Sequence, residues 1–125
     1  MIANDDIKIE VNTRYLRDQS DPESKHFVFA YSIAITNTGS EPVKLLTRHW
    51  QITDENNKVE EVHGDGVVGQ QPEIKPGQCF HYTSGAVLKT ELGTMAGSYG
   101  MVSAGGQKFD APIPPFVLSL PHTVH

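Results

Sequence analysis

The sequence is poor in cysteine, in basic residues and in long apolar runs, and each shortage excludes a class of protein. A single cysteine, Cys79, cannot form an intrachain disulfide, so a secreted, disulfide-stapled fold is not expected. Ten Lys plus Arg stand against fifteen Asp plus Glu, a formal charge of −5, which disfavours the counterion-releasing contacts of nucleic-acid binding. No apolar run approaches the ~20 residues of a membrane-spanning helix. We expect neither nucleic acid nor membrane as a partner.

The amino terminus also lacks the basic and apolar regions of a secretory signal. It reads Met1-Ile2-Ala3-Asn4-Asp5-Asp6, with acids where a signal peptide needs basic residues. We therefore expect a cytoplasmic protein. The 125 residues fit one domain, 1–125, that buries roughly two-thirds of its unfolded surface and needs neither a structural metal nor a cofactor to fold.

Sustained helical spacing is missing too, and the clearest pattern is an alternation of apolar and polar residues with period two. In Ile7–Tyr15 the odd positions are apolar or β-compatible and the even positions are polar, as in a half-buried strand. Further strands are expected at His26–Thr36, Val43–Thr53, Lys58–Val62, Gln78–Val87, Thr94–Val102, Lys108–Ala111 and Phe116–Leu120. We expect seven to nine short strands in all. His26–Thr36 is expected to be a central strand, and the proline-rich segment 111–115 is expected to cross at an edge. Short strands separated by turn residues, without alternating helices, predict an all-β antiparallel sandwich.

The segment His63–Gly77 is expected to be a shaped loop, and it contains a literal G-x-G-x-x-G at Gly64, Gly66 and Gly69. In dinucleotide-binding folds such glycines turn a strand into a helix whose amino terminus faces a pyrophosphate. Here Pro72 lies three residues after Gly69, so no multi-turn helix can begin there. Two interpretations stay open: a structural turn or bulge, which repeated glycine favours, and an anion site lined by backbone N–H groups.

Metal-ligand and catalytic patterns are incomplete. His63 and Asp65 are two apart and would share a strand face, but a zinc site needs three or four converging ligands. The sequence therefore predicts solvated or hydrogen-bonded histidines and no metal site, with His63 and Asp65 as the weak candidates. Cys79 has no adjacent basic residue to activate it, and Ser84 lacks the nucleophile-elbow glycines. No enzyme is predicted.

Arg48 and Trp50 indicate either a buried ion pair or an interaction surface, and not a catalytic or metal site. If Trp50 faces the core, Arg48 lies on the same face, where an arginine needs a partner. Either Arg48 pairs with a buried acid, or both residues lie at the rim of the sandwich, where Arg and Trp are typical of interaction hot spots. The first reading is favoured, and both stay open.

The pattern as a whole resembles the ApaG family. The matching stretches are Arg48-His49-Trp50, residues 64–85, Gly93–Met101 and the ending Pro121–His125. The resemblance implies a bacterial stand-alone domain with an immunoglobulin-like or fibronectin type III-like sandwich and no established catalytic activity. It also implies an association with cobalt resistance and magnesium efflux, and the suspected protein-interaction role of related domains in larger eukaryotic proteins. Without a membrane segment, a role in efflux would be indirect.

These observations lead to a hypothesis of a non-enzymatic protein-interaction or regulatory module. The candidate binding surface comprises Arg48, Trp50, Gly64, Asp65, Gly66 and Gly69. The expected partner is an unidentified protein, and a homo-oligomer is left open. The alternative is a small-ligand binder whose glycine-rich loop holds a phosphate, a diphosphate or a divalent-ion complex.

Overall fold

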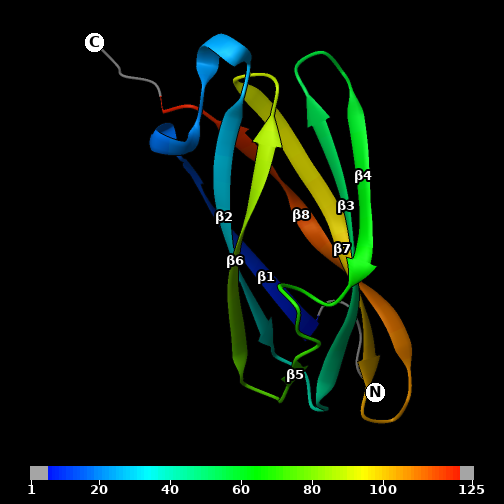
Figure 1. The fold of residues 1–125 in the computed structure, drawn as a ribbon. Coiled ribbons are helices and arrows are strands. Elements are labelled where there is room, and N and C mark those ends of the chain that lie inside the picture. The colour runs from blue at the N-terminus through cyan, green and yellow to red at the C-terminus, as the bar shows by residue number, and fades with distance from the viewer. Residues whose placement is uncertain (1–5, 122–125) are drawn as a thin grey trace.

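Alternating apolar side chains place one face of each long strand in a shared core between two sheets. In the central strand β2 (Phe27–Asn37), every odd position is buried, and Phe29 and Ile35 have no exposed surface. The computed structural model describes residues 6–121, and Figure 1 shows the two layers packed face to face. The antiparallel β-sandwich is confirmed.

The strands fall into a three-stranded and a five-stranded sheet. In chain order they are β1 (Ile7–Tyr15), β2, β3 (Val43–Asp54), β4 (Val59–Asp65), β5 (Glu73–Ile74), β6 (Cys79–Leu88), β7 (Leu92–Ser103) and β8 (Lys108–Ser119), with 3-10 turns η2 (Arg17–Gln19) and η3 (Pro22–Ser24) between β1 and β2. The first sheet has the order β1-β2-β6. The second has the order β4-β3-β7-β8, with β5 paired to the start of β3.

Two expectations need correction. The segments expected at Lys108–Ala111 and Phe116–Leu120 form one strand, β8, which continues through the prolines because the β7–β8 register shifts between Met95 and Gly97. As expected, β8 is an edge strand, where proline removes no ladder hydrogen bond. The segment expected as the loop His63–Gly77 begins inside β4, which extends to Asp65, and it includes β5.

The two long sides of the sandwich differ. On one side β1 contacts β8, so the two sheets meet along these strands. On the other side β4 and β6 are the outer strands of their sheets, and the connection from β4 to β6 passes from one sheet to the other (Figure 1). We call the β4–β6 side the open side.

An aromatic cluster links the sheets at the centre. Trp50, which is 3% exposed, contacts Tyr31, Tyr99 and Phe116 edge-on, with ring centroids 5.5, 6.3 and 5.8 Å away. Such edge contacts are favourable for aromatic rings. The hydroxyls of Tyr99 and Tyr82 share a hydrogen bond between the two sheets. The centre of the core is therefore held by packing and by one buried polar contact.

The tyrosine pair gives a stability prediction. Tyr82→Phe leaves the Tyr99 hydroxyl, in a residue that is 0% exposed, without its partner, at an expected cost of about 1–3 kcal/mol. The double variant Tyr82→Phe/Tyr99→Phe removes both polar groups and should be more stable than Tyr82→Phe alone. Urea unfolding of the three proteins measures this. A double variant less stable than Tyr82→Phe would contradict it.

The same pair predicts an alkaline transition. Burial raises the pKa of Tyr82 and Tyr99 above the ordinary value for a phenol. The folded state therefore holds both protons more tightly than the unfolded chain, so this stabilisation is complete below about pH 10 and is lost as the pH rises further. The free energy of unfolding, measured by urea titration at increasing pH, should fall more steeply for the wild type than for the double phenylalanine variant.

Candidate functional site

A β-bulge at Leu46 determines which side chains of β3 face the core. Val43 and Leu45 are buried, the β3–β7 register then shifts between Leu45 and Thr47, and the next core residue is Trp50. A bulge adds one residue to a strand and reverses the alternation beyond it. Arg48 and Trp50 consequently face inward, while His49 faces outward.

The bulge also holds the glycine-rich loop. The carbonyl oxygen of Leu46 accepts hydrogen bonds from the Gly66 N–H at 2.8 Å and from the Gln71 side-chain amide at 2.9 Å. Arg48 Nη1 donates to the carbonyl oxygens of Asp65 and Gly66, both at 3.0 Å. The loop is thus fixed to β3 on both sides of the bulge.

The hydrogen-bond partners of Arg48 differ from those that the sequence indicated. Its hydrogen bonds go to backbone carbonyls of the loop and not to a buried acid. Gly64 lies directly opposite Arg48 in the β3–β4 ladder, and a Cβ at Gly64 would come within 2.7 Å of the guanidinium. The first glycine of the motif thus leaves the space that the Arg48 guanidinium occupies, and a side chain there would make the guanidinium shift.

The rest of the G-x-G-x-x-G motif forms a two-residue hairpin turn. Val67 and Gln70 exchange backbone hydrogen bonds at 2.8 and 2.9 Å, and the central residues Val68 and Gly69 have φ angles of 44° and 79°. Positive φ at both central positions defines a type I′ turn, for which Asn or Gly is preferred and a β-branched residue is strained. Val67 is buried and Val68 is 52% exposed. Val67 thus packs the turn against the core, and Val68 is presented to solvent.

The turn leaves few backbone donors for an anion. The N–H groups of Gly66, Val67 and Gln70 all donate to carbonyl oxygens within the protein. The next regular element is the strand β5, so no helix amino terminus follows the motif. The structural interpretation of the glycines therefore fits this geometry better than the anion site.

Trp50, which is part of the candidate binding surface, lies in the core, the position that the favoured reading assumes for it. It is 3% exposed and is one of the residues that line a small cleft of about 180 Å³. The turn residues Val68 and Gly69 line the cleft, as do Tyr82 and Ser84 of β6. A typical small-molecule pocket is larger, at ~300–1,000 Å³.

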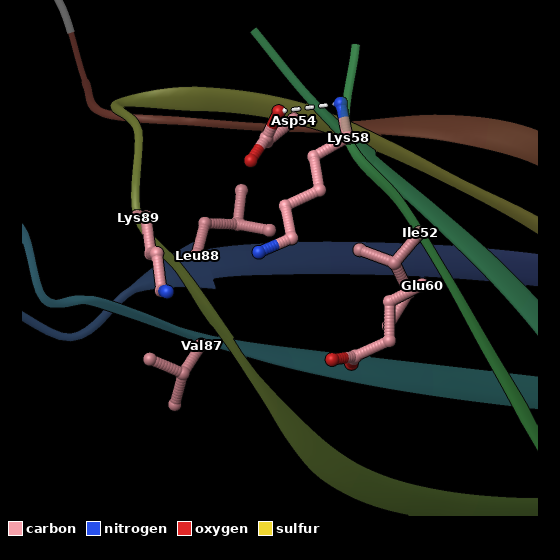
Figure 2. A pocket seen from close by; sticks show the side chains of 7 residues that line it. All are labelled: Ile52, Asp54, Lys58, Glu60, Val87, Leu88 and Lys89. Carbon is pink, nitrogen blue, oxygen red and sulfur yellow. Dashed lines mark hydrogen bonds between the residues drawn. The ribbon is translucent and has the colours of Figure 1, made fainter. Parts of the chain in front are cut away.

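A second groove lies along the same open side. Its volume is about 140 Å³, and it is lined by Ile52, Asp54, Lys58, Glu60, Val87, Leu88 and Lys89. Figure 2 shows the Lys58 side chain extending into it across from Val87 and Leu88. The Asp54 carboxylate accepts the Lys58 backbone N–H at 3.0 Å, which closes the hairpin at this end. The cleft and the groove thus border β6 at two places.

The sequence named His63 and Asp65 as weak metal-ligand candidates, but the structure groups His63 with other residues. His63 stacks on His49, with ring centroids 4.2 Å apart, and Glu61 completes a cluster of three. Asp65 lies further along β4 and is not in that cluster. The sequence reasoning missed His49 and Glu61, although a hairpin closed by Asp54 and Lys58 already implies that His49 stands opposite His63.

Comparison with known proteins identifies the family. A family model described as the ApaG domain matches residues 17–103. The chain belongs to the ApaG family. It is 53% identical over 119 residues to Protein ApaG of Xanthomonas campestris pv. campestris (strain B100) and of Azoarcus sp. (strain BH72), covering 95% of this chain and 94% of each relative.

Solved structures agree with this membership of the ApaG family. An X-ray structure from the Northeast Structural Genomics Consortium is 49% identical with a TM-score of 0.92, covering 98% of this chain and 92% of that one. The structure of the putative ApaA protein from Bordetella pertussis is 50% identical with a TM-score of 0.91, covering 94% and 96%. A protein from Archaeoglobus fulgidus, 10% identical with a TM-score of 0.57 over 93% of this chain and 100% of its own, shares the fold alone.

The sequence predicts no membrane-spanning helix, and the helices of the structure can be compared with that prediction. Within residues 6–121, none of the helices has the length and apolar character needed to cross a bilayer.

The strained turn gives a prediction of its own. Val68→Asn should raise the free energy of unfolding by about 1 kcal/mol, because asparagine tolerates positive φ and valine does not. Val68→Ala is the control, because it removes the exposed apolar groups and keeps a Cβ at a strained position. Urea unfolding compares the three proteins. If Val68→Asn is destabilising, contacts of the valine outweigh the strain of its backbone.

Proposed function

We propose that this ApaG-family chain is a non-enzymatic protein-interaction module that binds an extended segment of a partner protein along strand β6. The observation that carries the proposal is that the edge of β6 lacks the features that usually prevent strand pairing. It is the outer strand of its sheet, ten residues long and paired without a register shift to β2. Its sequence, CFHYTSGAVL, contains no proline and no Asp, Glu, Lys or Arg. Such an edge is a template for strand addition.

The other outer strands have the features that block edge pairing. β1 carries Lys8, Glu10 and Arg14, and it contacts β8. β4 is shorter and begins with a valine followed by two glutamates. β8 contains three prolines and has an extra residue at its register shift against β7. Charges, prolines and bulges all protect strand edges against pairing. This contrast supports the proposal that a partner pairs with β6.

The surroundings of β6 add side-chain contacts to the backbone. Val68, exposed at the type I′ turn, lines the cleft together with Ser84 of β6, and Val87, which is 54% exposed, lines the groove nearer the end of the strand. Alternate side chains of an added strand could enter the cleft and the groove, giving specificity to a contact made by backbone hydrogen bonds. Arg48 and Gly64 hold the turn in place, and we assign them a positioning role.

The small-ligand alternative has less support. Three backbone N–H groups of the glycine-rich loop are already used inside the protein, and the adjacent cleft is small. The association with cobalt resistance and magnesium efflux that the family resemblance implies would, under our proposal, follow from binding to another protein.

Two exposed valines provide a matched test. Val87 on β6 and Val117 on β8 are 54% and 52% exposed, so lysine at either site should disturb folding equally little. Val87→Lys places a charge on the open edge, which opposes strand addition. We expect tagged wild type and Val117→Lys to capture the same proteins from a bacterial lysate, and Val87→Lys to lose them. Mass spectrometry of the retained proteins measures the difference.

Three results would overturn this proposal. One is that no protein is retained specifically by the wild type. The second is that folded Val87→Lys, verified by circular dichroism, retains the same set as Val117→Lys. The third is loss of binding in Val117→Lys alone, which would place the interface on β8. Capture of this chain itself, lost in Val87→Lys, would identify the partner strand as β6 of a second copy.

A further inference from the structure

Three metal-ligating side chains converge on the outer face of β3 and β4, in the sheet that does not contain β6. His49, Glu61 and His63 each offer one ligand atom, and the three atoms all lie within 4.8 Å of one another. The two imidazole rings are stacked, with centroids 4.2 Å apart and planes inclined by 10°. The Nε2 of His49 is 3.4 Å from a carboxylate oxygen of Glu61.

The strand register places these residues together. His49 pairs directly with His63, and Glu61 stands opposite Gln51, the next outward-facing position of β3. Directly opposed and diagonal neighbours on one face of an antiparallel pair are within reach of each other's long side chains. The cluster therefore rests on two paired strands and not on a flexible loop.

Charge near the cluster favours a cation. Asp65 follows His63 on the same face of β4, and a shallow hollow extends from the two histidines across Gly100 to Asp110. Arg48 also borders this hollow, but its guanidinium donates hydrogen bonds to the carbonyl oxygens of Asp65 and Gly66. The outer face thus presents acids beside the histidines.

We propose that His49, Glu61 and His63 form a site for a zinc-class transition-metal ion with a water in the remaining position. Two imidazole nitrogens and one carboxylate oxygen suit Zn²⁺ and its first-row neighbours, whereas Mg²⁺ prefers oxygen ligands alone. Tetrahedral zinc holds its nitrogen and oxygen ligands about 3.3 Å apart. Side-chain rotation can bring the atoms that close, because the His49 and Glu61 side chains are 37% and 56% exposed.

Binding at this site would cross-link β3 to β4 without blocking β6. The cluster lies on the outer face of the five-stranded sheet, whereas β6 belongs to the three-stranded sheet. The metal and the proposed partner should therefore bind independently, and a failure of one proposal leaves the other standing.

Calorimetric titration of the full chain with ZnCl₂ tests the site. We expect one Zn²⁺ per chain at the cluster, and an affinity weakened by about tenfold or more in His63→Ala and in Glu61→Gln, since even the outer partners of metal ligands are worth that much. His81→Ala is the matched control, because His81 is an exposed strand histidine on β6. This control should bind as the wild type does, and Mg²⁺ should give no comparable heat.

NMR provides the second measurement. Zn²⁺ should shift the imidazole resonances of His49 and His63 and leave those of His81 unchanged. A variant with His122→Ala and His125→Ala, whose positions lie outside the described residues, should bind Zn²⁺ with the wild-type affinity. The proposal fails if millimolar Zn²⁺ gives neither heat nor shifts at His49 and His63, or if folded His63→Ala and Glu61→Gln bind as tightly as the wild type.

Discussion

The arrangement of the candidate surfaces depends on one extra residue in β3. The bulge at Leu46 reverses the alternation of the strand, so that Trp50 enters the core and His49 leaves it. It also turns the Leu46 carbonyl toward the loop, where Gly66 and Gln71 bind it. Without the extra residue, the pattern begun by Val43 and Leu45 would continue and place His49 inside, which would leave a tryptophan in solvent and a polar ring in the core.

The two long sides of the sandwich differ in whether a strand edge is free to pair with another chain. Contact between β1 and β8 joins the sheets on one side, and prolines and charges on these strands discourage further pairing. On the other side the β4–β6 connection crosses between the sheets and is held by Arg48 rather than by continuous strand pairing. This leaves the edge of β6 free, next to a turn whose exposed Val68 has an unfavourable backbone conformation. Strain of this kind is commonly retained where a residue has a role beyond stability.

The glycine motif illustrates how a familiar pattern can have an ordinary cause. Gly64 leaves room for the Arg48 guanidinium, Gly66 has a positive φ just before the type I′ turn, and Gly69 has a positive φ at its second central position. Each glycine is explained by the local geometry of the ApaG-family sandwich, and none requires a nucleotide. The likeness to dinucleotide-binding motifs ends at Pro72, where a strand pairing follows in place of a helix.

The sequence by itself determined the strands, the sandwich and the position of the glycine-rich turn, because period-two alternation and turn residues are local properties of each segment. It also placed Arg48 and Trp50 on one face. Only the tertiary structure decided that Trp50 is buried, that Arg48 binds loop carbonyls, and that His49 and Glu61 join His63. These outcomes depend on the bulge at Leu46 and on which strands become edges, and both are decided by pairing between segments distant in the chain, which no local pattern records.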